Sequence, residues 1–166
     1  MSVSAALVAW STLILTPSAA HAADLRQGDA IVVPIGETIE DDLYAAGQSV
    51  NVAGTVTGDV MAAGTNVVVT GPVSGSARLA GQTVEIGAPI GHDLLAGAAT
   101  LNVGPRGPIG RDVLVGGSAV TITGSVARSI RAGAESPTIG GPVGGDVMAQ
   151  AGTIRLVNGA GIQGSL

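Results

Sequence analysis

A repeat with a period of about 17 residues constrains the fold of this chain more than any other feature. The period is clearest in residues 57–73, whose apolar positions are Val60, Val67, Val69 and Val73. One period before Val67 the chain holds Val50, and one period after it the chain holds Val84. The pattern continues from about residue 31 to residue 166, with two extra residues after Val103 and again after Leu156. A period of this length predicts a solenoid, in which each unit contacts only its neighbours.

Each unit alternates apolar and polar residues over short stretches, which is typical of strands with one buried face. In the clearest unit we expect strands at residues 60–62 and 67–69 and a third inward position at Val73. Glycines such as Gly64 and Gly71 separate the stretches and favour sharp corners. We therefore predict an all-β, single-stranded parallel β-helix of seven to eight coils with about 17 residues per coil.

Three parts are expected along the chain. Residues 1–22 contain an apolar run, Ala5–Thr16, followed by Ala20-His21-Ala22, and this pattern indicates a signal peptide. Its removal would leave a chain exported to the periplasm or cell surface, without a transmembrane helix. The alternative is that this run forms a strand or helix that caps the domain. Residues 23–30 are expected to be a polar lead-in, and residues 31–166 the β-helix.

Within residues 31–39 the repeat is expected to place Val33, Ile35 and Ile39 at the positions of Val67, Val69 and Val73. The inserted segments Gly104–Pro108 and Val157–Gly161 are expected to be surface bulges at one corner.

Two further features concern the inside of the tube. Small inward residues at the position of Ala62, such as Ala45 and Ala96, are expected to narrow one corner of the tube. Pro137 falls on an inward strand position and cannot donate a backbone hydrogen bond, so the coil that contains it should be weakened.

Composition excludes several classes of function. The chain has no cysteine, so it has neither disulfides nor thiolate metal sites. Its formal net charge is −5 and its 7 Lys and Arg residues form no cluster, so we expect no nucleic-acid partner. We find no phosphate-binding loop, zinc-ligand spacing or catalytic triad, and we expect neither a cofactor nor enzymatic activity. An enzyme would need a pocket that the sequence does not show.

The repeat units TGDVMAAGTNVVVTGPV, IGRDVLVGGSAVTITGSV and VGGDVMAQAGTIRLVNG resemble those of the bactofilins, the polymer-forming bacterial cytoskeletal proteins. The resemblance covers residues 31–166 and implies a right-handed β-helix that forms filaments through end-to-end contacts. Two features depart from the family, because this chain carries an export pattern and contains no Phe for an aromatic cap. The alternative fold is a left-handed hexapeptide helix, which needs an apolar residue at every sixth position.

One polar column recurs at the position of Asp59. Its acidic members are Asp42, Asp59, Asp93, Asp112 and Asp146. Stacked carboxylates about 5 Å apart could bind a cation such as Ca²⁺. The other interpretation is that these side chains cap corners by accepting hydrogen bonds from backbone N–H groups. Ser76 and Ser129, which share the column, suit corner capping better than metal binding.

An outward column of large side chains recurs at the position of Met61. Its apolar members are Tyr44, Met61, Leu95, Leu114 and Met148. An exposed apolar stripe on a rod indicates a lateral contact surface. The alternative is that these side chains only cover a glycine-rich backbone.

The ends of the solenoid are the expected sites of self-assembly, because an uncapped parallel edge can pair with another edge. The residues expected there are Ile31, Val33, Ile35, Ile162 and Leu166. The sequence thus predicts a structural protein of the bacterial envelope that polymerises end to end. Two alternatives stay open: an exported binding or adhesive module that uses a lateral face for an envelope partner, and a chain that is one piece of a longer protein.

Overall fold

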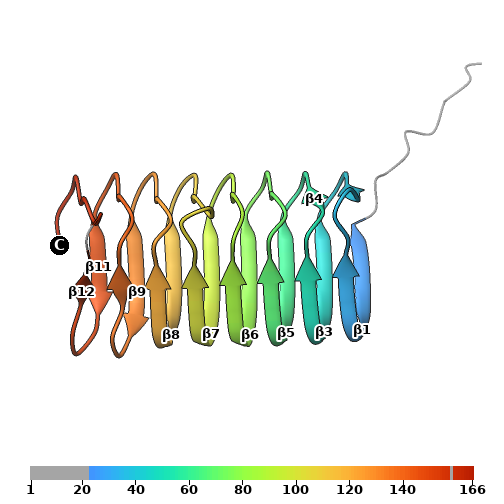
Figure 1. Cartoon of the computed structure of the whole chain (residues 1–166), viewed down its shortest axis with the longest axis horizontal. Coiled ribbons are helices and arrows are strands. Elements are labelled where there is room, and N and C mark those ends of the chain that lie inside the picture. Colours follow the sequence, from blue (N-terminus) through green and yellow to red (C-terminus); the bar gives the residue numbers. More distant parts are fainter. Residues whose placement is uncertain (1–22, 158) are drawn as a thin grey trace, which may run out of the picture.

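Parallel pairing between consecutive coils builds the whole structure, a β-solenoid of about 8 turns (Figure 1). The computed structural model describes residues 23–157 and 159–166, and the described elements are all strands. The coils begin at Asp24, Leu43, Val60, Ala77, Leu94, Val113, Ile130 and Val147. The predicted all-β solenoid with a period of about 17 residues is confirmed. The segment predicted to be a signal peptide lies outside the described residues.

Each of the first six coils contributes one long strand. These strands are β1 (Asp24–Val33), β3 (Leu43–Val52), β5 (Val60–Val69), β6 (Ala77–Ile86), β7 (Leu94–Val103) and β8 (Val113–Ile122). The two strands expected in each coil are therefore one, which bends at a corner without losing its pairing. The expected third strand is reduced in most coils to a single bridge, such as Val56 to Val73. The corner keeps its pairing because Gly47 stacks on Gly64, and Gly64 on Gly81.

The remaining strands are short. They are β2 (Thr38–Ile39), β4 (Thr55–Val56), β9 (Ile130–Ala134), β10 (Thr138–Ile139), β11 (Val147–Gln150) and β12 (Arg155–Leu156). β9 ends before Pro137 and β10 begins directly after it, and the proline itself is buried. The ladder is thus interrupted at Pro137, as expected for a residue without an N–H, and the weakening of this coil stays a prediction.

The interior of the tube is filled by stacked aliphatic side chains. Val67, Val84 and Leu101 lie in register on consecutive coils and are fully buried. None of the described polar or charged residues is buried. Burial of each such Val or Leu side chain contributes about 1.5–3 kcal/mol, so the stack supplies most of the stabilisation of the rod. The predicted narrow corner is also confirmed, because Ala45, Ala62 and Ala96 are buried inside it.

A second corner depends on the absence of a side chain. A Cβ atom on Gly71 would lie 1.8 Å from the carbonyl oxygen of Gly54 in the preceding coil. No side chain fits at that distance, so glycine lets the two coils approach closely enough to pair.

The first coil differs from its prediction in two ways. β1 begins at Asp24 and pairs with β3 in the register Asp24 to Leu43 and Val33 to Val52. The expected lead-in therefore belongs to the first coil. Val33 corresponds to Val69 and not to Val67, and Ile35 is 88% exposed instead of inward. The error has a physical cause. A turn at residues 34–37 adds two residues to the first coil, and Ile35 in that turn is apolar and lies one 17-residue period before Val52.

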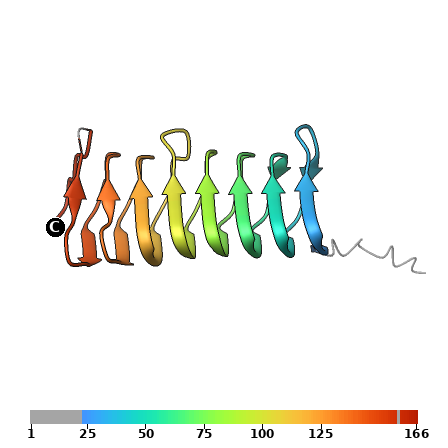
Figure 2. The ribbon, with the colours of Figure 1, turned by 60° about the horizontal axis from the view of Figure 1, so that its bottom comes forward.

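The two insertions that were predicted do form turns at one corner, and the turn of the fifth coil projects clearly in Figure 2. The N–H of Gly107 donates to the carbonyl of Gly104 at 2.9 Å, and the N–H of Ala160 donates to that of Val157 at 3.0 Å. The turn of the first coil has the same bond, from Glu37 to Pro34 at 3.1 Å. Each insertion thus closes on itself and leaves the register of the neighbouring coils intact.

Candidate functional site

The column of Asp and Ser side chains caps a corner of the solenoid. The backbone N–H of Asp59 donates to Oδ1 of Asp42 at 2.7 Å, and the N–H of Ser76 donates to Oδ1 of Asp59 at 2.8 Å. The same bond joins later coils, for example from the N–H of Ser165 to Oδ1 of Asp146 at 2.7 Å. Each acceptor satisfies an N–H group of the next coil, which confirms the prediction of corner capping.

The same bonds weigh against the alternative of a cation column. In residues 23–157 and 159–166, no group of three or more His, Cys, Asp or Glu side chains is placed to hold a metal ion. The second oxygen of Asp59 pairs instead with Nη1 of Arg78 at 2.7 Å. That bond and the N–H of Ser76 lower the pKa of Asp59 below its usual value. Asp112 similarly faces Arg128 at 3.7 Å.

The large outward side chains form a continuous column, which we call the lateral face. From the first coil to the eighth its members are Leu25, Tyr44, Met61, Arg78, Leu95, Leu114, Arg131 and Met148. The apolar members named in the sequence prediction are exposed, as expected. Leu25 is the residue that the prediction missed, and it is 67% exposed. Leu25 precedes Tyr44 by one period plus the two inserted residues. The sequence pattern did not reveal it because the turn at residues 34–37 was not recognised.

A flat strip runs beside the lateral face. Two positions further along, the outward residues of the second to seventh coils are small, for example Ala46, Ala63 and Gly97, whereas the first and eighth coils hold Gln27 and Gln150. Leu25, Tyr44 and Met61 border a shallow hollow above this strip. The lateral face is therefore a ridge of large side chains next to a strip that exposes little beyond backbone, a shape that a second elongated surface can approach closely.

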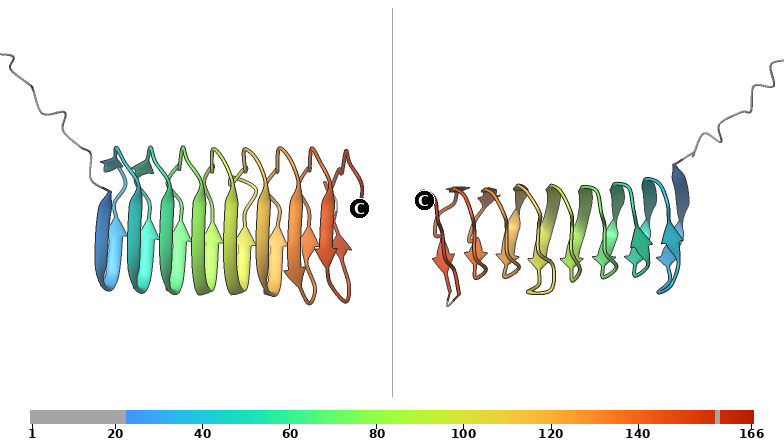
Figure 3. Two further views of the ribbon diagram at one scale, coloured as in Figure 1. Left: turned by 180° about the vertical axis from the view of Figure 1, so that it is seen from behind. Right: turned by 90° about the horizontal axis from the view of Figure 1, so that it is seen from above.

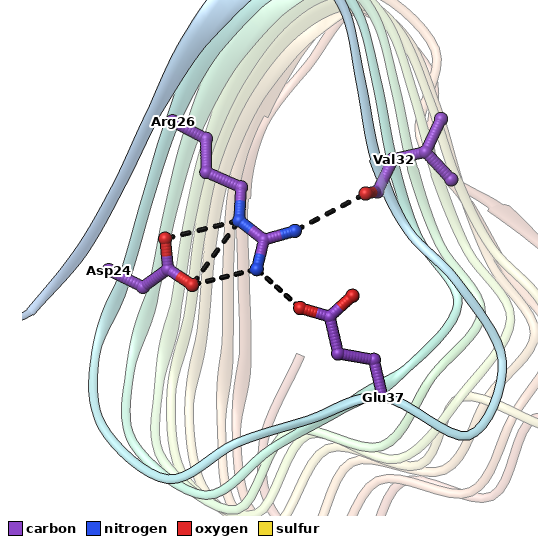
Figure 4. A network of polar contacts seen from close by, with 4 residues as sticks. All are labelled: Asp24, Arg26, Val32 and Glu37. Atoms are coloured by element: carbon purple, nitrogen blue, oxygen red, sulfur yellow. Dashed lines mark hydrogen bonds and ion pairs between the residues drawn. The ribbon is translucent and has the colours of Figure 1, made fainter.

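The N-terminal end of the tube is closed by charged side chains (Figure 4). Arg26 stacks on Ala45 and occupies the inward corner that alanine holds in the next two coils. Its guanidinium donates to Asp24 at 2.7 Å, to Glu37, and to the carbonyl of Val32 at 3.3 Å. The hydrogen bond from Arg26 lowers the pKa of Asp24, and the two carboxylates raise the pKa of Arg26.

We call Asp24, Arg26 and Glu37 the charged end. Ile31 and Val33, two of the residues expected to take part in self-assembly at this end, are buried beneath the charged end. Inward-pointing charges at an edge coil oppose the addition of another coil, because their desolvation is not repaid by a new partner.

The eighth coil presents the opposite chemistry. Leu156 continues the interior column of Ile139, yet it is 46% exposed because no further coil covers it. Leu166 is 68% exposed and Ile162 is partly buried. The N–H of Val147 donates to the carbonyl of Ser165 as that of Val60 does to the carbonyl of Ser76, so Leu166 has the register position that Ala77 has above Val60. A hollow of about 520 Å³ lies where this end meets the lateral face, and Ile154 and Leu166 line it together with Leu114, Arg131 and Met148.

We call Ile154, Leu156, Ile162 and Leu166 the apolar end, and Figure 3 shows the two ends at opposite extremes of the rod. Among the described residues no helix is long and apolar enough to cross a membrane. Comparisons of the chain with protein-family models, with curated proteins and with solved structures find no match. The rod therefore offers three candidate surfaces for function: the lateral face, the charged end and the apolar end.

Proposed function

We propose that this chain is a non-enzymatic structural protein of the bacterial cell envelope, and that it self-assembles through an end of its β-solenoid. The observation that carries the proposal is the apolar end, where interior side chains of the eighth coil are exposed. The resemblance to the bactofilins and the export pattern of residues 1–22 support the family of functions and the location.

Association at the apolar end has a clear driving force. Leu156 and Leu166 are both large and exposed, and burial of one such side chain contributes about 1.5–3 kcal/mol. The strands of the eighth coil also present backbone groups with no further coil to pair with. A second copy offers a surface of the same chemistry and the same rounded triangular outline, which the view along the rod in Figure 4 shows.

The charged end determines which contact forms. A head-to-tail contact would place Arg26 and its two carboxylates against Leu156 and Leu166, and would desolvate three charged groups without giving them a new polar partner. A contact between two apolar ends avoids that cost. We therefore infer that two rods join tail to tail.

Negative-stain electron microscopy of the purified chain tests this proposal. At about 4.8 Å per coil a single rod is about 38 Å long and a tail-to-tail pair about 76 Å. The Leu166→Asp variant should show rods no longer than about 38 Å, because it places a charge in the end contact. The matched control is Ile35→Asp, which changes an exposed apolar residue at the other end and should leave the pairs intact. Single rods in the unmodified chain, or pairs that survive Leu166→Asp, would contradict the proposal.

A further inference from the structure

The lateral face carries an arginine in each coil whose corner is capped by a serine. We call the corner-capping residues the capping column; they are Asp42, Asp59, Ser76, Asp93, Asp112, Ser129 and Asp146. The two coils that hold serine at the capping position, at Ser76 and Ser129, hold Arg78 and Arg131 two residues later. The coils with aspartate at that position place a large apolar side chain there instead, as in Asp42 with Tyr44. In these two columns the fourth and seventh coils therefore present serine and arginine, whereas the neighbouring coils present an aspartate and a large apolar side chain.

We propose that two copies of this chain pair through their lateral faces in antiparallel orientation, with the first coil of one copy against the eighth coil of the other. The two-fold axis of such a pair lies in the interface between the rods and is perpendicular to their length. Each column of one copy therefore faces the same column of its partner. The fourth coil then faces the fifth, the third faces the sixth, and the second faces the seventh.

This alignment brings each arginine near, although not directly opposite, an aspartate of the partner copy that has no ion-pair partner among the described residues. Arg78 in the fourth coil faces Leu95 of the partner copy, two residues after Asp93, and Arg131 in the seventh faces Tyr44, two residues after Asp42. Two other aspartates of the column have partners within one chain, because Asp59 pairs with Arg78 and Asp112 with Arg128. A guanidinium has five N–H donors, so Arg78 can bind Asp59 and a second carboxylate.

The apolar members also match in this alignment. Met61 faces Leu114, and Leu25 faces Met148, so large exposed side chains bury each other. Arg131 meets the ring of Tyr44, a favourable pairing of a cation with an aromatic face.

A parallel pair would bring Arg78 against its own copy and Arg131 against its own copy. Like charges placed together oppose association, so the charge pattern selects the antiparallel pair.

Lateral pairing changes what end contacts can build, and this consequence rests on the proposed function. Tail-to-tail contact alone stops at two rods, because each rod has one apolar end. An antiparallel lateral pair has two apolar ends, which point in opposite directions. Each can join another lateral pair, so the two contacts together give a polymer of unlimited length.

Cysteine cross-linking tests the lateral pair directly, because the natural chain has no cysteine. We would prepare Met61→Cys and Leu114→Cys with different affinity tags, both in a Leu166→Asp background that removes the tail contact. Oxidation of the mixture should give the mixed disulfide in about tenfold excess over same-variant dimers, because Met61 and its own copy lie about 14 Å apart, beyond the reach of a disulfide.

The matched control is the pair Asn66→Cys and Ala119→Cys, which lie exposed on the same two coils but away from the lateral face. This mixture should give no disulfide above background. The proposal is overturned if Met61→Cys and Leu114→Cys stay monomeric on oxidation, if Met61→Cys links to itself as readily, or if the control pair links equally well. Cross-linking in the Leu166→Asp background would show that the lateral contact forms without the tail contact.

Discussion

In the part of the chain that the structure describes, the first and eighth coils each have a neighbouring coil on one side only, yet they present opposite chemistry on the other side. The first coil places Arg26 inside the tube and surrounds its guanidinium with Asp24, Glu37 and a carbonyl. The eighth coil keeps apolar residues at its inward positions and leaves Leu156 and Leu166 exposed. Because every coil of a repeat offers the same ladders, a single inward charge is enough to make one end differ from the other.

The largest expected effect contrasts the middle of the rod with the apolar end. Leu101→Ala should lower the free energy of unfolding by about 2–5 kcal/mol, because Leu101 is 1% exposed and its removal leaves a cavity. Leu156→Ala at the end should cost less than about 1 kcal/mol in single rods, since much of that side chain already contacts water. Urea denaturation of both variants in a Leu166→Asp background measures the difference. Equal losses would contradict the description of the eighth coil.

A smaller effect is expected at the charged end. Arg26→Ala should lower the free energy of unfolding by about 1–3 kcal/mol, because Asp24 and Glu37 lose their shared partner while staying close together. Arg106→Ala is the control, because Arg106 is exposed in the turn of the fifth coil, and this change should stay within about 0.5 kcal/mol. Thermal unfolding of both variants is the measurement. If the two substitutions cost the same, the network does not stabilise the first coil.

The seventh coil offers a way to strengthen the side of the rod near the apolar end. Pro137→Val restores a backbone donor at a position where the coils before it hold Val120 and Leu101. We expect a gain of about 0.5–1 kcal/mol and slower hydrogen exchange in residues 134–139. Hydrogen-exchange mass spectrometry compares the variant with the parent chain. Unchanged exchange in this segment would show that Pro137 is not the cause of the short strands β9 and β10.

The smallest effect is a pH dependence confined to the charged end. The pKa of Asp24 is lowered in the folded chain by its hydrogen bond with Arg26, from an unperturbed value of 3.8. Its stabilisation is therefore complete above that value and is lost as the pH falls through the lower folded pKa. The melting temperature of the parent chain should fall more than that of Asp24→Asn when the pH is lowered from about 5 to about 2.5. Parallel curves for the two proteins would argue against this ion pair.

The sequence alone predicted much of the fold because the repeat determines it. Stacked Val, Ile and Leu, the bulge at Gly104–Pro108 and the interruption at Pro137 all follow from a regular register and the chemistry of single residues. Corner capping by Asp59 and its equivalents also follows, since a carboxylate at a corner readily accepts a hydrogen bond from a backbone N–H.

The charged end could not be predicted in the same way. Arg26 lies in a polar segment that looks like a solvated lead-in, and only the hidden two-residue insertion places it inside the tube. Ile35 made the false register attractive because it is apolar at the spacing of the repeat. The pairing of Arg78 with Asp59 was missed for another reason: a contact between coils depends on rotamers as well as on register.

The most direct test of the difference between the two ends is the position of a label in joined rods. Ile35→Cys places a single thiol at the first coil, and a small gold label on it can be located by negative-stain microscopy in a Leu114→Glu background that blocks lateral pairing. Tail-to-tail contact predicts two labels per joined pair, at its outer extremes and about 76 Å apart. Labels at the junctions, or labels spaced about 38 Å apart along a chain of rods, would contradict the account.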